Sequence, residues 1–378
     1  MKPKSTFAGV EISEIRKMNA LAGRDTINLG IGQLPDDLPL ALREKGLEAF
    51  AQGQTRYTSN QGNLELRKLI AAYHSQKNGR NYSADQVIVT NGAEGALWNI
   101  YSVYLDRDEE VLIPEIAFSV YQTIAELHGG KAVTYKLNKD FSIDLADLER
   151  KINGKTKFIV INSPNNPTGA VLTSEQVSAV TEIAERKGIY IISDEIYSEL
   201  FFGEKQPSSP MEYSDRVLTV DGISKRAAAT GLRIGWTICP EEIAKPMIVA
   251  NQYVTTCASS VSQYAAIASL DGSTDDFVKR IREELREKGE YAWKTLKSIK
   301  GIHVEKPEGA FYIFPDISAF DTSREVALRI LDEVDVLTIP GLAFGERGRN
   351  HIRISFAVDF DRLKEALSRI KHLFENWE

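Results

Sequence analysis

The sequence predicts an α/β protein in which a larger unit holds a mostly parallel, seven-stranded sheet between helices and a smaller unit is α+β. Three observations support this prediction. Apolar β-type runs alternate with amphipathic helical stretches through the middle of the chain. Most of these runs are continuous Val, Ile and Leu, which is typical of strands that are buried on both faces. The length of 378 residues allows about two domains.

The larger unit is expected over residues 45–273. Helical patterns separate several of its strands, including one over residues 95–105 and one over residues 174–187 that ends before Gly188. Strand–helix–strand repeats of this kind favour parallel pairing, with the helices on both faces of the sheet. The seven candidate strands are residues 86–90, 110–114, 132–137, 157–162, 188–194, 216–222 and 235–240.

The smaller unit is expected over residues 1–44 and 274–378. The first 44 residues fit no position in the central sheet, so they are expected to pack on the C-terminal part of the chain. That part begins with a long, charged helical stretch whose charges form a solvated face. Its expected elements are helices over residues 274–300 and 361–375 and strands over residues 309–315 and 351–357.

Composition excludes several classes of protein. The net charge is −7, and no run of Lys or Arg forms a surface for nucleic acid. No stretch is apolar for long enough to span a membrane, and residues 1–6 lack the apolar core of a signal peptide. The two cysteines, Cys239 and Cys257, form no disulfide framework, which favours a cytoplasmic location. The five histidines lack metal-ligand spacing, so no metal site is expected.

Lys225 is the first candidate for chemistry. It follows the predicted strand over residues 216–222, at the carboxyl end where α/β folds bind their ligands. A lysine amine can attack a carbonyl group and form a Schiff base, provided that burial or nearby cations remove its proton. Arg226 and Arg233 are close enough in sequence to supply that positive potential. Taken alone, such a lysine is more often a surface residue.

Asp194 ends the predicted strand over residues 188–194 at the same edge of the sheet. A buried carboxylate needs a cationic partner, and a protonated pyridine nitrogen is one such partner. The structural alternative is an N-cap for a following helix. If that segment is helical, Tyr197 shares a face with Asp194.

Two turns at the same edge carry weaker signals. Residues 163–169 (Ser-Pro-Asn-Asn-Pro-Thr-Gly) suit a plain turn, although Asn166 can also donate to a phenolate oxygen. Residues 90–97 run from a strand into a helix through small residues, where free backbone N–H groups can bind a phosphate.

Taken together, these motifs resemble the class I/II aminotransferases, which are pyridoxal phosphate enzymes of fold type I similar to aspartate aminotransferase. Each motif is short, but their joint order and spacing are specific. The resemblance covers nearly the whole chain. It is carried by residues 27–32, 57–62, 166–169, 194–197, 224–225, 231–235, 339–341 and 352–355.

The resemblance implies how the chain would hold pyridoxal 5′-phosphate. Lys225 would form the Schiff base and move the substrate proton, and Asp194 would pair with the ring nitrogen. Asn166 and Tyr197 would bind the phenolic oxygen, and Phe118 would stack on the ring. By its pattern alone, Phe118 is more often a core residue. The phosphate would bind the backbone N–H groups of Ala93 and Glu94 and the side chains of Ser224 and Arg233.

Further implied contacts concern the substrate and a second subunit. Arg353 would bind the substrate α-carboxylate near Asn166 and the backbone of Gly32. The alternation around Arg353 also fits a solvated strand face. Tyr57 would reach the phosphate of a neighbouring subunit, which implies a homodimer with shared active sites.

The function implied is transfer of an amino group between an L-amino acid and a 2-oxo acid in a ping-pong cycle. A carbon–sulfur β-lyase on the same fold is the alternative, because it needs almost the same residues. A pyridoxal-binding regulator is disfavoured by the acidic composition. Some similar aspartate aminotransferases carry a lysine that contacts the distal carboxylate at the position of Glu94. Aspartate, neutral and aromatic donors therefore all stay open.

Overall fold

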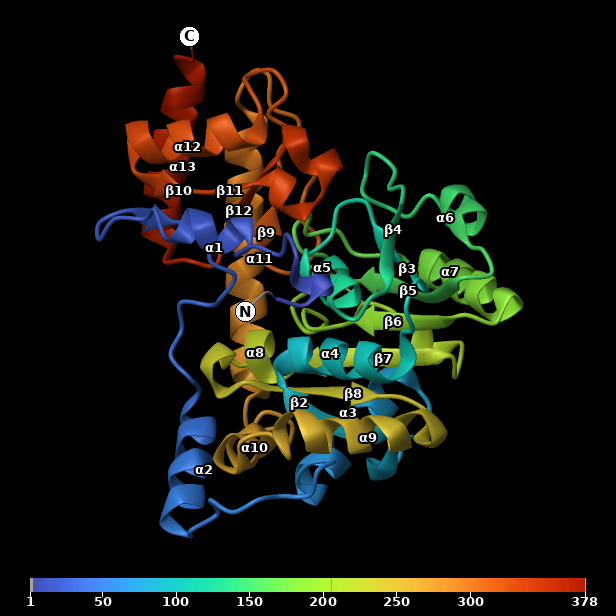
Figure 1. The fold of residues 1–378 in the computed structure, drawn as a ribbon. Coiled ribbons are helices and arrows are strands. Elements are labelled where there is room, and N and C mark those ends of the chain that lie inside the picture. The colour runs from blue at the N-terminus through green and yellow to red at the C-terminus, as the bar shows by residue number, and fades with distance from the viewer. Residues whose placement is uncertain (1–2, 205, 378) are drawn as a thin grey trace.

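The structure is a computed structural model that describes residues 3–204 and 206–377 (Figure 1). Residues 1 and 2, part of the stretch from which no signal peptide is expected, lie outside the described residues, as does residue 378 of the predicted smaller unit.

A seven-stranded sheet forms the centre of the molecule and confirms the predicted α/β class. All seven predicted strands are present, each within two residues of its predicted ends. In spatial order they are β2 (Val87–Asn91), β8 (Ile234–Ile238), β7 (Val217–Gly222), β6 (Tyr190–Asp194), β5 (Thr156–Asn162), β3 (Glu110–Pro114) and β4 (Lys131–Tyr135).

One strand departs from parallel pairing. β8 runs antiparallel to both of its neighbours, β7 and β2, whereas the other four pairs are parallel. The connection from β7 to β8 holds only the short helix α8 (Ile223–Arg226) and the turn η4 (Thr230–Leu232). It is too short for a parallel crossover, which needs a dozen or more residues. The start of β8 therefore lies at the edge of the sheet where β7 ends.

Helices cover both faces of the sheet. Along β2, Ile88 points into one core while Val87 and Val89 point into the other, as expected for a strand buried on both faces. The first core also receives α4 (Gly92–Tyr104), α5 (Val120–Leu127) and α9 (Glu241–Thr255). The second receives α2 (Leu40–Ala51), α3 (Leu64–Asn78), α6 (Leu145–Lys151), α7 (Ser174–Lys187) and α10 (Ser260–Ile267).

The predicted helix over residues 174–187 is α7, with the same ends. Thr173 accepts from the backbone N–H of Gln176, whose side chain caps Thr173 in return, so the helix begins with a capping box. Gly188 ends it in the left-handed conformation.

The N-terminal and C-terminal parts of the chain share a further core. β1 (Ile27–Asn28) pairs in parallel with β10 (Val336–Leu337), so the N-terminal segment packs on the C-terminal part as predicted. Three short strands form an antiparallel sheet, in the order β11 (Ile339–Pro340), β12 (Ile352–Ser355) and β9 (Tyr312–Ile313). The helices here are α1 (Glu14–Asn19), α11 (Asp275–Lys297), α12 (Ser323–Val334) and α13 (Phe360–Glu375).

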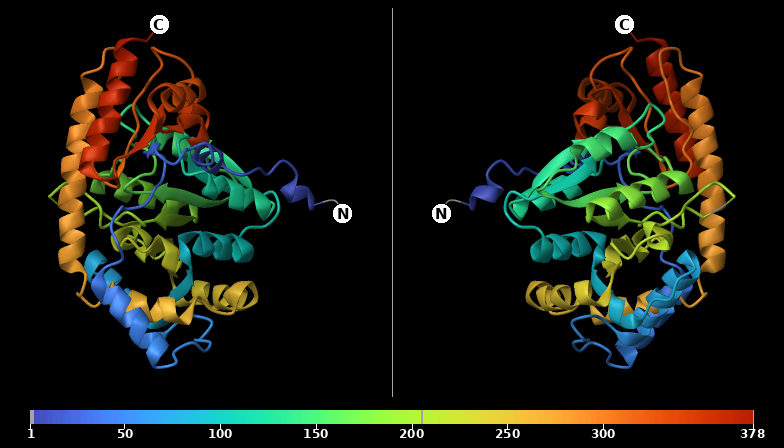
Figure 2. Two further views of the ribbon diagram at one scale, coloured as in Figure 1. Left: turned by 90° about the vertical axis from the view of Figure 1, so that its left-hand side faces the viewer. Right: turned by 90° about the vertical axis from the view of Figure 1, so that its right-hand side faces the viewer.

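The charged stretch after residue 274 forms α11, which lies along the side of the molecule (Figure 2). Its exposed face is charged, as predicted, while Val278, Ile281 and Leu285 are buried at helical spacing. Figure 2 also shows the N-terminal segment extending away from the body of the protein. The remaining short turns are η1 (Ser5–Phe7), η2 (Ala84–Gln86), η3 (Pro210–Glu212), η5 (Gly341–Phe344) and η6 (Glu346–Asn350).

Within residues 3–204 and 206–377, no helix is both long and apolar enough to cross a membrane. The same residues contain no group of three or more His, Cys, Asp or Glu side chains that could hold a metal ion.

Candidate active site

The pairing of the strands brings the candidate residues to one edge of the sheet. β5, β6 and β7 are parallel and in register, with Asn162 opposite Asp194 and Asp194 opposite Val220. The antiparallel β8 begins at this edge, and β2 ends beside it. The segments that carry Asn166, Asp194, Lys225 and Arg233 therefore meet there, next to the start of α4.

Lys225 lies in α8, directly after β7. Its Nζ donates a hydrogen bond of 2.6 Å to the backbone oxygen of Gly32, so the amine points into the protein. Burial, together with the positive charges of Arg353 and Arg233, lowers the pKa of Lys225 to about 8. About one tenth of the amines are then neutral at pH 7. The arrangement therefore suits a lysine that forms a Schiff base.

Asp194 is buried at the end of β6. The hydroxyl of Tyr121 donates to its Oδ2 at 2.6 Å, and the backbone N–H of Ile196 donates to its Oδ1 at 3.1 Å. Burial raises the pKa of Asp194 to about 6, although these two donors oppose the shift. Both donors are neutral, so the carboxylate suits a cationic ligand.

The segment after Asp194 is a turn rather than the helix considered for it. The backbone N–H of Ser198 donates to the Glu195 oxygen at 2.8 Å, and the Asp194 carboxylate closes a turn onto Ile196 instead of capping a helix. The condition under which Asp194 and Tyr197 would share a helical face is therefore not met. The Tyr197 hydroxyl lies instead 3.0 Å from the hydroxyl of Tyr312.

Arg353 lies in β12 and is only 2% exposed, so it does not belong to a solvated strand face. Its Nη1 donates to Asn166 Oδ1 at 2.9 Å and its Nη2 to the Gly30 oxygen at 2.6 Å. The guanidinium lies 4.4 Å from the centre of the Tyr312 ring, and no residue in the described part of the chain bonds to its buried Nε. A carboxylate would satisfy such a guanidinium.

Asn166 connects Arg353 to Asp194. The side chain of Asn162 accepts from the backbone N–H of Asn166 at 2.9 Å and donates to the backbone oxygen of Asp194 at 3.0 Å. The peptide bonds before Pro164 and Pro167 are cis. The Asn162 side chain thus holds the turn that carries Asn166 against the end of β6.

The start of α4 and the Arg233 guanidinium lie side by side. Gly92 has a φ of +73°, and a Cβ there would lie 2.7 Å from Arg233 Nη2. A Cβ on Gly235 would lie 2.5 Å from the backbone nitrogen of Ala93. Glycines at both positions therefore allow the free N–H groups of the first turn of α4, which include those of Ala93 and Glu94, to lie beside the Arg233 guanidinium. A helix N-terminus beside a guanidinium suits a phosphate.

The other predicted residues fall into two groups. Phe118 is half-buried and packs edge-on against Tyr121, with 6.2 Å between the ring centres, and Ser224 is buried beside Lys225. Tyr57 is 84% exposed, and no contact with the other candidates brings it into this site. Tyr121 and Tyr312 received no role from the sequence. The helical spacing of Tyr121 from Phe118 was the available signal for the first of them.

These residues fit pyridoxal phosphate part by part. Lys225 suits its aldehyde, the buried Asp194 suits its pyridinium nitrogen, and Arg233 with the start of α4 suits its phosphate. Arg353, with its unpartnered Nε, adds a place for a carboxylate. The fold and the site thus define a pyridoxal phosphate enzyme that acts on carboxylate substrates.

Comparison with known proteins identifies the family. The profile described as "Aminotransferase class I and II" matches residues 24–370. A Methanocaldococcus jannaschii protein named "Probable aspartate aminotransferase" is 38% identical over 98% of this chain and 99% of its own. The "Aromatic-amino-acid aminotransferase 2" of Thermococcus litoralis is 36% identical over 97% and 96%. The structure of Thermus thermophilus aspartate aminotransferase with maleate superposes with a TM-score of 0.94, at 31% identity over 99% and 100% of the two chains.

The chain belongs to the class I and II aminotransferase family. It is an aminotransferase that uses pyridoxal phosphate and converts amino acids and 2-oxo acids. These findings confirm the predicted fold, enzyme class, cofactor and substrate classes. The relatives cited are aminotransferases, so the carbon–sulfur lyase alternative gains no support from them.

Proposed function

We propose that this chain performs transamination with Lys225 as the Schiff-base lysine and proton carrier, Asp194 as the partner of the ring nitrogen and Arg353 as the carboxylate ligand. The observation that carries the proposal is the Lys225 amine, which is held at the Gly32 oxygen with a pKa of about 8. Arg353 and Asp194 both act on its charge, so the three groups share one site.

The chemistry divides between the cofactor and the protein. Bound pyridoxal phosphate supplies an electron-withdrawing ring that allows an amino acid to lose its Cα proton. Asp194 keeps a proton on the ring nitrogen, because a buried anion favours the charged form of its partner. Arg353 orients the substrate through its carboxylate. Lys225 Nζ carries the proton to and from Cα, since its pKa near 8 lets it both accept and return one.

The remaining site residues have supporting roles in this proposal. Tyr197 and Asn166 would bind the phenolic oxygen of the cofactor, and Phe118 would stack on its ring. Gly32 would lie near the substrate carboxylate. The phosphate ligands would be the backbone N–H groups of Ala93 and Glu94 and the side chains of Ser224 and Arg233. Most of these contacts concern the cofactor, and Arg353 recognises the α-carboxylate that all α-amino acids share. This accords with relatives named for aspartate and for aromatic amino acids.

Replacing Asp194 by asparagine tests the proposal. The variant keeps the size of the side chain but removes the anion, so the ring nitrogen loses its proton. We expect kcat to fall by about 10²- to 10³-fold, as for loss of a buried ionic partner. The absorbance of the bound cofactor changes with pH as Lys225 Nζ loses its proton, and the midpoint of this change should rise. A ring without its own proton carries less positive charge, so Lys225 Nζ keeps its proton to higher pH. Spectrophotometric titration and steady-state rates measure both. Asp361→Asn, at an exposed position, is the control; a wild-type midpoint in Asp194→Asn would refute the role of Asp194.

We also propose that the functional unit is a homodimer in which Tyr57 reaches the phosphate of the neighbouring subunit. The loop around Tyr57 borders a surface cavity of about 650 Å³ lined by residues from Gln52 to Arg67 and by Tyr264. Apolar side chains lie exposed on the neighbouring helices, which favours burial against a second copy. They are Leu40, Leu47 and Phe50 of α2, Leu64 of α3, and Val249, Tyr253 and Val254 of α9.

Charged residues in this surface should separate the subunits. We expect the double variant Leu47→Asp/Phe50→Asp to sediment as a monomer, because two carboxylates would otherwise be buried at the interface. Transamination should fall by about tenfold or more, since Tyr57 no longer reaches a phosphate. Tyr213→Asp, which changes an exposed aromatic residue outside this surface, should leave the sedimentation unchanged. A double variant that stays dimeric would place the interface elsewhere.

Two further predictions remain part of this proposal. The division into residues 45–273 and residues 1–44 with 274–378 is supported by the shared core of the N-terminal and C-terminal parts, which also includes a few residues of the central part. The cytoplasmic location rests on the composition, including the two cysteines, both of which are free thiols.

A further inference from the structure

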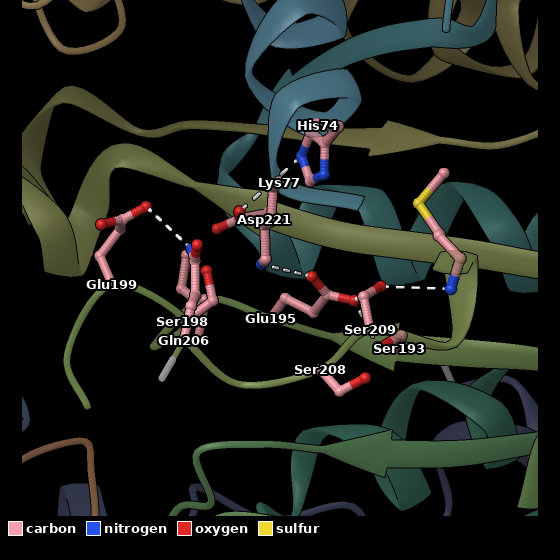
Figure 3. Close-up of polar contacts among 12 residues, drawn as sticks. His74, Lys77, Ser193, Glu195, Ser198, Glu199, Gln206, Ser208, Ser209 and Asp221 are labelled. Carbon is pink, nitrogen blue, oxygen red and sulfur yellow. Dashed lines mark hydrogen bonds and ion pairs between the residues drawn. The ribbon is translucent and has the colours of Figure 1, made fainter. Parts of the chain in front are cut away.

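A buried ionic cluster lies behind the active site, between α3 and the ends of β6 and β7 (Figure 3). The reaction as derived above uses none of its members. We call it the Lys77 cluster; its residues are Tyr73, His74, Lys77, Glu195, Asp221 and Arg226.

Lys77 and Glu195 are the centre of the cluster. Lys77 Nζ lies 2.7 Å from Glu195 Oε2, and the two side chains are only 3% and 4% exposed. Glu195 Oε1 also accepts from Ser193 Oγ at 2.9 Å and from Ser209 Oγ at 2.5 Å. Burial acts against both charges, but the pair outweighs it, so the pKa of Glu195 is lowered and that of Lys77 is raised. Both groups therefore stay charged.

Glu195 is the residue after Asp194, and the two side chains point to opposite sides of the sheet. Asp194 bonds to Tyr121, which packs in the core of α4, α5 and α9. Glu195 bonds to Lys77 of α3, whose apolar residues pack in the other core. The backbone N–H of Glu195 donates to the Val220 oxygen at 2.8 Å, which extends the β6–β7 pairing. A contact that fixes the Glu195 side chain therefore also restrains the backbone that carries Asp194.

The same face of α3 contacts the segment of Lys225. His74 Nε2 lies 3.9 Å from Asp221 Oδ2, at the end of β7, and accepts from Trp236 Nε1 at 3.0 Å. Burial lowers the pKa of His74 to about 3 and raises that of Asp221 to about 8, although Lys77 opposes the second shift. The carboxylate in direct contact with Lys77 Nζ is that of Glu195.

Arg226 is the residue after Lys225, and its guanidinium lies 4.9 Å from the centre of the Tyr73 ring. The Tyr73 hydroxyl donates in turn to Glu199 Oε1 at 2.5 Å. Lys77 lies three residues after His74 and four after Tyr73, so it is next to both on the surface of α3. Tyr73 contacts Arg226, the neighbour of Lys225, and Lys77 contacts Glu195, the neighbour of Asp194. The Lys77–Glu195 pair is therefore the charged contact on the Asp194 side.

We propose that Lys77 is a positioning residue of the transaminase site: its ammonium holds Glu195, and so fixes the backbone that orients the Asp194 carboxylate. This inference rests on the role given to Asp194 above. Without Lys77, the Glu195 carboxylate is buried without a cation and either takes up a proton or moves. The orientation of Asp194 then loosens, and its hold on the proton of the ring nitrogen weakens.

The test uses the holoenzyme of Lys77→Met. The pH midpoint of the absorbance change of the bound cofactor should rise by about 0.5 unit or more, because a less protonated ring lets Lys225 Nζ keep its proton to higher pH. We expect kcat to fall about tenfold with KM within about twofold, the signature of a step after binding. Thermal unfolding of the holoenzyme measures the structural cost separately.

A second variant covers the case in which Lys77→Met fails to fold. Lys77→Met/Glu195→Gln removes both charges of the pair together, so it should fold and still show the raised midpoint. Arg150→Met is the matched control, because it removes the partner of Asp147, a carboxylate that is 1% exposed in α6. It should lower the melting temperature without moving the midpoint.

Three outcomes overturn the inference. The first is a wild-type midpoint and kcat in Lys77→Met with only a lower melting temperature, which makes the pair purely structural. The second is a shift in Lys77→Met that disappears in the double variant, which traces it to a stray charge. The third is a lowered midpoint. The Asp194→Asn variant separates the role of Asp194 from the role of Lys77. If Asp194→Asn shifts the midpoint and Lys77→Met does not, only the role of Lys77 fails.

Discussion

Replacing Lys225 by alanine should abolish repeated transamination. Lys225 is the group whose amine lies at the Gly32 oxygen with a pKa lowered to about 8 by burial and by two arginines. Alanine removes both the attachment point of the cofactor and the carrier of the Cα proton. We expect kcat to fall by about 10⁴-fold, the upper range for loss of a general base.

Added amines make this result specific. A small primary amine can diffuse into the space left by the side chain and carry the proton, so it should restore part of the rate in Lys225→Ala but not change the wild-type rate. Stopped-flow absorbance of a single half-reaction measures the effect. Lys364→Ala, at an exposed position of α13, is the control and should behave as wild type. Wild-type turnover in Lys225→Ala without added amine would end the mechanism.

Replacing Arg353 by leucine should produce the second large loss. Arg353 is 2% exposed, and its Nε has no hydrogen-bond partner among the residues that the structure describes. A substrate carboxylate that enters the leucine variant is desolvated without a cation. Truncating one partner of a buried charge pair costs about 2–5 kcal/mol, so kcat/KM should fall by about 30- to 4000-fold.

The comparison of two donors separates binding from misfolding. A primary amine without a carboxylate makes no contact with Arg353, so its slow reaction should be nearly the same in Arg353→Leu and in the wild type. In Arg353→Leu, the rate with an amino acid should fall most of the way to the rate with that amine. Arg349→Leu, at an exposed position in the preceding turn, is the control. An equal loss for both donors would show that Arg353 supports the fold instead.

The sequence predicts the central sheet well because its strands are buried on both faces. Continuous apolar runs such as Val217–Gly222 stand out from the amphipathic helices beside them. Such a run predicts a strand but not whether it pairs in parallel, so it does not reveal that β8 is antiparallel. The direction of β8 follows from the short connection after Lys225, which permits only an antiparallel return.

The site shows where local pattern is insufficient. Arg353 alternates with Ile352 and Ile354, a pattern typical of a solvated face, yet β12 is covered on both sides. Only the resemblance, which combines motifs along the chain, identified it. Tyr312 was missed because its partner, the Tyr197 hydroxyl, is 115 residues away in sequence. The buried pair of Lys77 and Glu195 is 118 residues apart and gives no local signal either.

Two hydrogen bonds of the site join segments that lie far apart in the sequence. Lys225 Nζ to the Gly32 oxygen and Arg353 to Asn166 each link the central sheet to a segment near one end of the chain. A substrate that contacts both Lys225 and Arg353 would join the same segments. Any separation of these segments would then pull the ligands of the substrate apart, so a bound substrate should oppose it.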